Sequence, residues 1–279
     1  MDTPEAKPPL AWQPITPPGV AAFARASLGR LLLVQFLVAL AAAGVLVWFL
    51  SAAWFPVIAT AIRHLPATGE IRSARLGWHG ESPTALAEGS FLALAVDLTH
   101  QGEARSPAHI QVEFGSQDVE ILSLFGFLKI PYPQTWVIAF NRVELQPWWG
   151  AWAPEILALA AGGVVAGLML VWSALATIYF VPAWIGAFFA NRQLTLRGSW
   201  QLAGAALLPG ALFQTGAVMV YGLGGLDLVR LLVTAGLHLA IGWIYLGASV
   251  FCLPRHPAVA DAKPNPFDDS NRAPSTGEH

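Results

Sequence analysis

Long charge-free apolar segments constrain this chain more than any other feature. The segment LLLVQFLVALAAAGVLVWFL, residues 31–50, contains Gln35 but no ionisable side chain. About 20 consecutive apolar residues are enough for a helix to cross the hydrocarbon core of a bilayer. Only 11% of the 279 residues are charged, whereas in a soluble globular domain about a quarter are. The sequence therefore predicts an α-helical integral membrane protein.

The apolar segments predict about four membrane-spanning helices. The first covers residues 31–62, and Trp48 and Trp54 mark its interface with water. In the third span, Pro209 lies near the centre, where a proline removes a helix hydrogen bond, so we expect a kink there. Spans two to four fall within residues 154–252, at about 155–180, 200–221 and 226–252.

Residues 154–190 are too long for one straight crossing and barely short of two crossings with a turn. Each crossing needs about 17–25 residues. We expect one span that Pro182 ends or kinks, followed by an interfacial segment near residues 182–192. The alternative is a tight re-entrant pair, which would place Arg192 and Arg197 outside the cytoplasm, against the rule that basic residues stay inside.

Residues 66–150 differ sharply from the apolar segments. They carry five basic and nine acidic side chains, a net charge of −4. The runs FLALAVDL, HIQVEF, DVEIL and TWVIAF have strand length, and turn-forming residues separate them. We therefore expect a small β-rich domain between spans one and two. The ends of the chain, residues 1–30 and 254–279, are rich in proline, and we expect disordered tails.

Basic residues near the span ends predict the orientation, because Lys and Arg are retained on the cytoplasmic side. Five arginines agree on one orientation, and Arg63 and Arg230 oppose it. We expect both termini in the cytoplasm and the β-rich domain outside it, in the periplasm if the chain resides in a bacterial inner membrane. The five arginines are Arg25, Arg30, Arg192, Arg197 and Arg255.

Three stretches carry a resemblance to a known family. They are GEIRSARLGW at residues 69–78, LALAVDL at 92–98 and LRGSWQLAGAALLPGAL at 196–212. With the order of one span, a β-rich module and three further spans, they resemble an uncharacterised bacterial membrane-protein family, domain of unknown function 1189, in the wider Yip-type membrane group. The resemblance implies this architecture and supplies no catalytic residue.

His238 falls near the middle of the fourth span, where an ionisable group is costly unless it faces other helices or water. The candidate intramembrane polar site combines it with Gln214 and Thr215 of the third span. The alternative is a neutral imidazole that only hydrogen-bonds a neighbouring helix. Asp227, about 16 Å from His238 along the helix, and Glu155 are interpreted as solvated span ends.

Gly163 and Gly167 lie four residues apart in span two, so both occupy one helix face, where two backbones can approach closely. An internal helix contact is the favoured interpretation, and a contact with a second copy of the chain is the alternative. Trp148, Trp149 and Trp152 precede this span, and we expect them to anchor the β-rich domain at the membrane interface.

Motifs for catalysis, metal binding or cofactor binding are missing from the sequence. HExxH, GxSxG, a Walker loop and a dinucleotide-binding glycine fingerprint do not occur in a suitable context. His79, His100 and His109 are spaced irregularly, and we interpret them as surface residues. The net charge of −2, without a basic cluster, argues against a nucleic-acid partner. We expect no metal and no cofactor.

Two function classes follow from these patterns. The first is a non-enzymatic multi-pass membrane protein that acts as a scaffold, with its outer domain binding a protein partner or a second copy. The second is a transporter or permease accessory subunit that uses the polar site in spans three and four, since broken helices and buried polar groups form solute paths. An intramembrane enzyme would need at least two reactive groups at one depth, and only His238 is clear.

Overall fold

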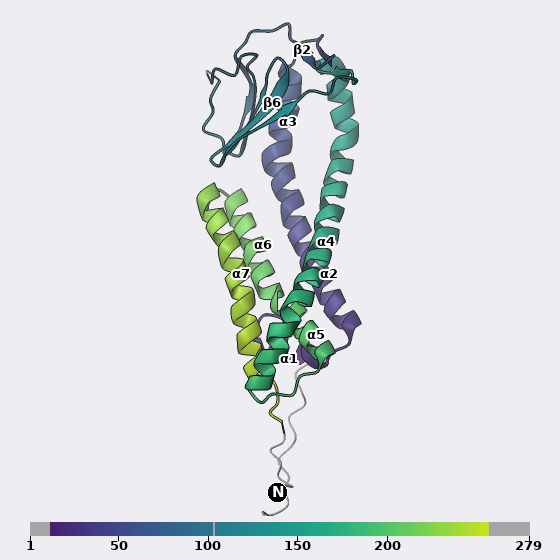
Figure 1. Cartoon of the computed structure of the whole chain (residues 1–279). Coiled ribbons are helices and arrows are strands. Elements are labelled where there is room, and N and C mark those ends of the chain that lie inside the picture. Colours follow the sequence, from purple (N-terminus) through teal and green to yellow (C-terminus); the bar gives the residue numbers. More distant parts are fainter. Residues whose placement is uncertain (1–11, 103, 257–279) are drawn as a thin grey trace, which may run out of the picture.

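The computed structural model describes residues 12–102 and 104–256, and Figure 1 shows an elongated helical bundle with a small strand region at one end. It has four helices long and apolar enough to cross a membrane. This result confirms the predicted number of apolar helices and the separate small β-sheet region. Parts of both predicted tails, residues 1–11 and 257–279, lie outside the described residues. The four helices cover Leu28–His64, Arg142–Phe189, Leu196–Gly222 and Leu228–Phe251.

The first long helix consists of three consecutive pieces. Helix α2, Leu28–Phe49, is followed by a π-helical turn, Leu50–Trp54, and by α3, Phe55–His64. The 22 residues of α2 extend about 33 Å at about 1.5 Å per residue, enough to cross a hydrocarbon core of about 30 Å. Helix α3 therefore continues the axis beyond that length and carries the strand region (Figure 1).

Helix α4, Arg142–Phe189, is a single helix of 48 residues, so two boundary predictions were wrong. The helix continues through Pro182 and includes most of the segment expected to lie along an interface. It also begins inside the range 66–150 that we assigned to the β-rich domain. A proline inside a helix costs about 3 kcal/mol or more. Here Ala183 and Ala187, on the same helix, are buried in the main apolar core, and this packing opposes the cost.

The third apolar helix is interrupted at one residue. Helix α5, Leu196–Ala206, ends at Leu207, and α6, Leu208–Gly222, begins directly after it. Pro209 occupies the first turn of α6, where a proline lacks only a backbone N–H that has no helical acceptor. The last helix, α7, covers Leu228–Phe251, and the side chain of Asp227 caps its first turn.

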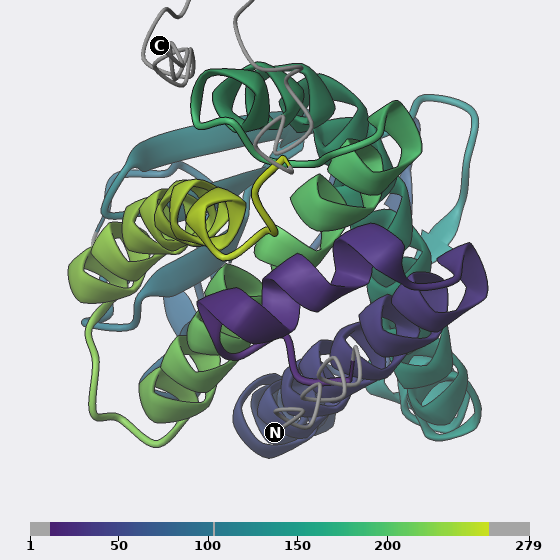
Figure 2. The ribbon, with the colours of Figure 1, turned by 90° about the horizontal axis from the view of Figure 1, so that it is seen from below.

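Residues 17–25 are ordered, which contradicts the prediction of a disordered tail over residues 1–30. Helix α1, Pro17–Ala22, and the 3-10 turn η1, Phe23–Arg25, pack against α5 and α7. Val20 and Phe23 are fully buried in the main core. Figure 2, the view from below, shows this purple segment crossing the end of the bundle. The sequence signal was weak because the apolar residues are too few for a clear helical period.

The strand region contains two sheets. A three-stranded sheet has the order β2-β1-β8, and a five-stranded sheet has the order β3-β4-β5-β6-β7, in which only β4 and β5 are parallel. The strands are β1 Glu70–Arg72, β2 Arg75–Gly77, β3 Thr84–Glu88, β4 Leu92–Val96, β5 Ile110–Phe114, β6 Asp118–Ser123, β7 Gly126–Pro131 and β8 Ile138–Ala139.

Alternation along β5 and β6 gives the larger sheet one apolar and one polar face, as a two-residue period requires. Val112 and Phe114 pack with the apolar cluster that also contains residues of α3. Gln111 and Glu113 lie on the opposite face, although both are buried. The sheet therefore rests on α3 through its apolar face and carries buried polar groups on the other.

An aromatic cluster joins the strand region to the end of the bundle. Phe91, in the turn before β4, lies 5.2 Å from Phe49 of α2 and 4.9 Å from Tyr221 of α6, measured between ring centroids. The His109 ring, just before β5, stacks on Tyr221, and its Nδ1 lies 2.7 Å from the Tyr221 hydroxyl oxygen. The first residues of β4 and β5 are thus level with the ends of α2 and α6.

Candidate functional site

A cavity of about 290 Å³ lies among α2, α4, α6 and α7, and its wall is almost entirely apolar. Its polar groups belong to Trp172, Tyr179 and three further side chains, and those three are the ones that the sequence predicted for an intramembrane site. The structure places Gln214 and Thr215 of α6 and His238 of α7 at this one cavity. Most small-molecule sites have this composition, an apolar wall with a few polar groups that fix orientation.

His238 bonds to its own helix and not to the third span. Its Nδ1 lies within hydrogen-bond distance of the Ala235 carbonyl oxygen. A carbonyl only accepts, so Nδ1 carries the proton, and in the neutral ring Nε2 keeps a free lone pair. The imidazole therefore offers an acceptor to a molecule in the cavity.

Gln214 and Thr215 differ in how they are satisfied. The Thr215 hydroxyl donates to the Ala211 carbonyl oxygen at 2.8 Å, which leaves its own oxygen lone pairs available. The side-chain oxygen of Gln214 is buried and has no hydrogen-bond partner in the described part of the chain. A buried polar group without a partner costs about 1–3 kcal/mol, and a hydroxyl or amide donor in the cavity would remove that cost once the Gln214 amide turns toward it.

A close approach of two backbones fixes the position of His238 relative to α6. A methyl group added at Gly210 would collide with the carbonyl oxygen of His238, so only glycine fits between the two helices. Gly210 follows Pro209 directly, in the first turn of α6. Gln214 lies one helical turn, about 6 Å, further along α6, and it lines the same cavity as His238.

The remaining predicted residues lie elsewhere. Apart from its chain neighbours and the local helix backbone, a methyl group added at Gly163 or Gly167 would meet no atom within 4 Å, so neither glycine makes the close internal contact that we favoured. Trp148 and Trp149 line an apolar groove beneath the larger sheet. The ring of Trp152 stacks on that of Trp148 at 6.4 Å, on the same exposed side of α4.

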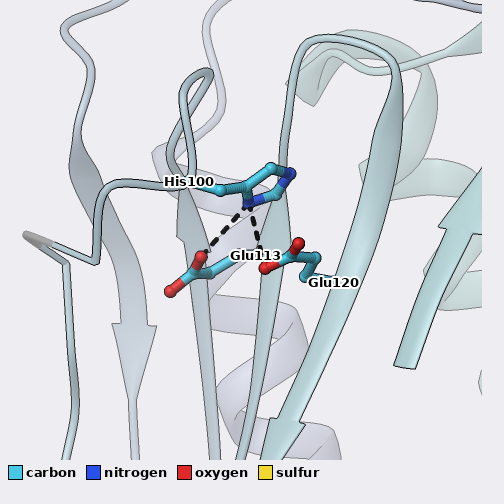
Figure 3. A group of neighbouring side chains, drawn as sticks. All are labelled: His100, Glu113 and Glu120. Atoms are coloured by element: carbon cyan, nitrogen blue, oxygen red, sulfur yellow. Dashed lines mark hydrogen bonds and ion pairs between the residues drawn. The ribbon is translucent and has the colours of Figure 1, made fainter. Parts of the chain in front are cut away.

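A second polar group, which the sequence reading missed, lies on the polar face of the larger sheet (Figure 3). His100 Nδ1 lies 3.3 Å from a Glu113 carboxylate oxygen and 3.6 Å from one of Glu120. The opposite ring nitrogen lies 2.7 Å from an oxygen of Asp118. Gly115 makes room for the ring, because a methyl group there would collide with it. Our interpretation of His100 and His109 as plain surface residues was wrong.

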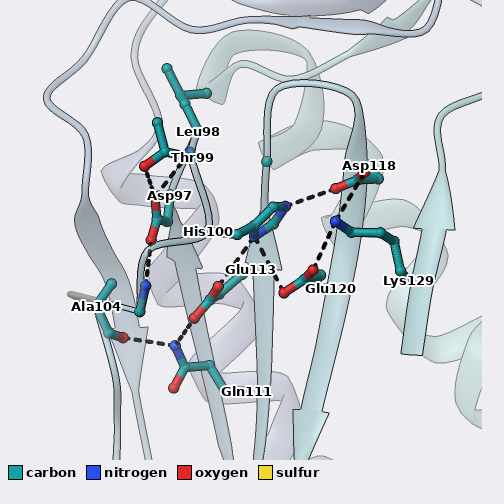
Figure 4. A network of polar contacts seen from close by, with 12 residues as sticks. Asp97, Leu98, Thr99, His100, Ala104, Gln111, Glu113, Asp118, Glu120 and Lys129 are labelled. Atoms are coloured by element: carbon teal, nitrogen blue, oxygen red, sulfur yellow. Dashed lines mark hydrogen bonds and ion pairs between the residues drawn. The ribbon is translucent and has the colours of Figure 1, made fainter. Parts of the chain in front are cut away.

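The neighbours of this cluster satisfy most of its atoms, as Figure 4 shows. Gln111 donates to Glu113 at 2.8 Å, and the Lys129 ammonium lies 3.0 Å from Glu120. Burial lowers the pKa of His100, but hydrogen bonds to Asp118 and Glu113 and the charge of Glu120 outweigh it, so its pKa is raised overall. The imidazole is thereby favoured in its charged form, which donates from both nitrogens.

His100, Glu113 and Glu120 are also the one group in the described residues whose ligand atoms are close enough, within 4.8 Å of one another, to hold a metal ion. A metal would need the Nδ1 lone pair, and so a neutral imidazole. The raised pKa and the nearby Lys129 both work against that state. The arrangement therefore fits a set of ion pairs that fasten the loop at His100 to strands β5 and β6 better than it fits a metal centre.

No protein-family model, no curated protein and no solved structure matches this chain. The resemblance to domain of unknown function 1189 therefore stays a prediction. What the chain does has to be inferred from its own cavities and side chains.

Proposed function

We propose that this chain is a non-enzymatic membrane protein that binds a small amphipathic molecule in the cavity among α2, α4, α6 and α7. The observation that carries the proposal is the buried oxygen of Gln214, which has no partner among the described residues, beside Thr215 and His238 in a largely apolar wall. A ligand with a hydroxyl or amide head and an apolar body matches this wall. The ligand would enter the cavity laterally from the bilayer. Lateral entry suits an accessory subunit of a transporter that receives a solute dissolved in the membrane.

The proposed topology has both termini in the cytoplasm of a bacterial inner membrane and the strand region on the outer side. Arg192 supports it, because its side chain donates to the Leu253 carbonyl oxygen at 2.6 Å. The ends of α4 and α7 thus meet at one end of the bundle, where two basic residues, Arg192 and Arg255, pair through their backbones. That end is opposite the strand region (Figure 1).

The test is photocrosslinking of the full chain, reconstituted in lipid vesicles, with a diazirine-bearing long-chain alcohol. Crosslinks should map to α6 and α7 and should be competed by unlabelled alcohol but not by the alkane of equal length. Gln214→Leu should lower the yield roughly tenfold, since a lost hydrogen bond of about 1.4 kcal/mol has that effect. Crosslinks spread evenly over all lipid-facing helices would refute the proposal.

Two threonines of the bundle provide a matched control. Thr215 and Thr234 each donate a hydroxyl to a carbonyl of their own helix, at 2.8 Å and 2.7 Å. Only Thr215 lines the cavity. Thr215→Val should therefore reduce crosslinking, whereas Thr234→Val should leave it unchanged. Equal losses in the two variants would point to a general effect on the helices.

A second candidate function is partner binding through the outer domain, and one observation favours it. A wholly apolar groove of about 410 Å³ lies between α3, the start of α4 and the apolar face of the larger sheet. Ile62, Phe114 and Trp149 are among its lining residues. An apolar segment of a partner protein would fit there. Val119→Trp, which fills the groove, should abolish capture of such a partner, and Val137→Trp on an exposed strand flank should not.

A further inference from the structure

The turn between β6 and β7 presents large apolar side chains that nothing in the described part of the chain covers. Residues 121–128, ILSLFGFL, contain no ionisable side chain. Exposed apolar patches of this kind usually mark a surface that contacts a partner or a membrane. Leu124, Phe125, Phe127 and Leu128 are between 58% and 70% exposed.

Strand register gives the height of this turn above the bundle. Ile110 pairs with Ser123, so the turn that follows Ser123 is level with the start of β5. His109, the residue before Ile110, lies 2.7 Å from the Tyr221 hydroxyl at the end of α6. The turn of residues 124–125 is therefore level with the end of an apolar helix long enough to span a membrane.

The direction of the strands agrees with this placement. Further from the turn, Lys129 of β7 forms ion pairs with Asp118 and Glu120 of β6. The uncharged part of the hairpin is thus its end nearest the bundle, where the surface of a bilayer crossed by α6 would lie. Figure 1 shows the sheet above the ends of α6 and α7.

Local hydrogen bonds prepare the turn for an apolar environment. The Ser123 hydroxyl accepts from the Phe125 backbone N–H at 3.2 Å and donates to the Gly126 carbonyl oxygen at 3.4 Å. Gly126 has a φ of 119°, a conformation that other residues rarely adopt. Backbone groups that are already paired enter the edge of a bilayer at less cost than unpaired ones.

We propose that the β6–β7 hairpin inserts its tip, the turn of residues 124–125 and the first residues of β7 up to Leu128, into the lipid leaflet nearest the strand region. The partner is the lipid of the same membrane that the helices cross, not a second protein. The aromatic rings of Phe125 and Phe127 would lie among the acyl chains near the headgroups, and the charged pairs would stay in water. The hairpin then gives the outer domain a second attachment to the membrane, in addition to the two helices that carry the domain.

Depth-dependent fluorescence tests this contact. Cys252 is the only cysteine, so Cys252→Ser provides a background for single labelling sites. Phe125→Cys carries an environment-sensitive NBD dye in the turn. The control is Gln117→Cys, an exposed position in the turn between β5 and β6 at the opposite end of the strands. Both proteins are reconstituted as full chains in phosphatidylcholine vesicles, with or without lipids spin-labelled near the headgroup.

The dye at position 125 should emit at shorter wavelength than the dye at 117 and should be quenched several-fold more by the spin-labelled lipid. Water-like emission with equal quenching at both positions would overturn the proposal. A blue shift at 125 that grows with protein density and is insensitive to spin-labelled lipid would also overturn it, because a second copy would then cover the hairpin. The outcome does not depend on whether the cavity near His238 binds a ligand.

Discussion

The contact between Gly210 and His238 yields the sharpest prediction for the helical bundle. A methyl group at position 210 would collide with the His238 carbonyl oxygen, which belongs to the backbone and cannot rotate away. Helices α6 and α7 must then separate locally. Overpacking of this kind costs about 1–3 kcal/mol. Alanine gains at most about 1 kcal/mol over glycine in helix propensity, so Gly210→Ala should be destabilising overall.

A second glycine of the same helix supplies the control. Apart from its chain neighbours and the local helix backbone, a methyl group at Gly216 meets no atom within 4 Å. Gly216→Ala should therefore be neutral or stabilising by up to about 1 kcal/mol, because only the propensity term remains. The difference between the two variants should be about 1–3 kcal/mol.

Thermal unfolding in a mild detergent, followed by tryptophan fluorescence, measures this difference. Gly210→Ala should lower the midpoint by several degrees, and Gly216→Ala should not lower it. Because the collision lies beside the proposed cavity, Gly210→Ala should also reduce photocrosslinking by the long-chain alcohol. If both variants unfolded at the same temperature, the inferred backbone contact between α6 and α7 would be wrong.

Three further predictions concern the strand region and the end of the bundle opposite to it. The folded-state pKa of His100 is raised, so the charged imidazole stabilises the folded state below about pH 6.5, and this stabilisation is lost as pH rises through the raised pKa. Unfolding measured at pH 5.5 and 8.5 should show this dependence. His100→Gln should remove it. Added Zn²⁺ should leave the melting temperature unchanged, and a rise that Glu113→Gln abolishes would instead reveal a metal site. Phe23→Ala should cost about 3–5 kcal/mol, because the ring is fully buried, whereas Phe251→Ala, at an exposed position, should cost far less.

The apolar helices could be predicted from the sequence because the requirement for about 20 apolar residues acts on local composition. Their exact ends could not. Pro182 signals a helix end by itself, yet neighbouring Ala183 and Ala187 are buried in the core and the helix continues. Phe23 lies in a proline-rich stretch without helical period, and only the tertiary fold reveals the site that buries it.

The cluster around His100 shows which features of a site can be predicted from one sequence. In IQVEF and DVEIL, polar residues two positions apart predict that Gln111 and Glu113 share one strand face, and likewise Asp118 and Glu120. The register that sets Glu113 opposite Glu120 depends on strand pairing, and the approach of His100 depends on a loop conformation with φ of 52°. Neither the strand register nor this loop conformation can be predicted from local composition.

The interruption at Leu207 connects the fold with the proposed cavity. Helix α5 is buried from Gln201 to Ala206, and Gln35 of α2 donates to the Gly204 carbonyl oxygen at 3.3 Å, so α5 is held inside the bundle. Helix α6 begins after the break with Pro209 and Gly210, and its glycine admits the backbone of α7. A larger residue at position 210 would keep α7 further away. The close approach at Gly210 therefore accounts for why residues on two different spans, Gln214 and His238, line one cavity.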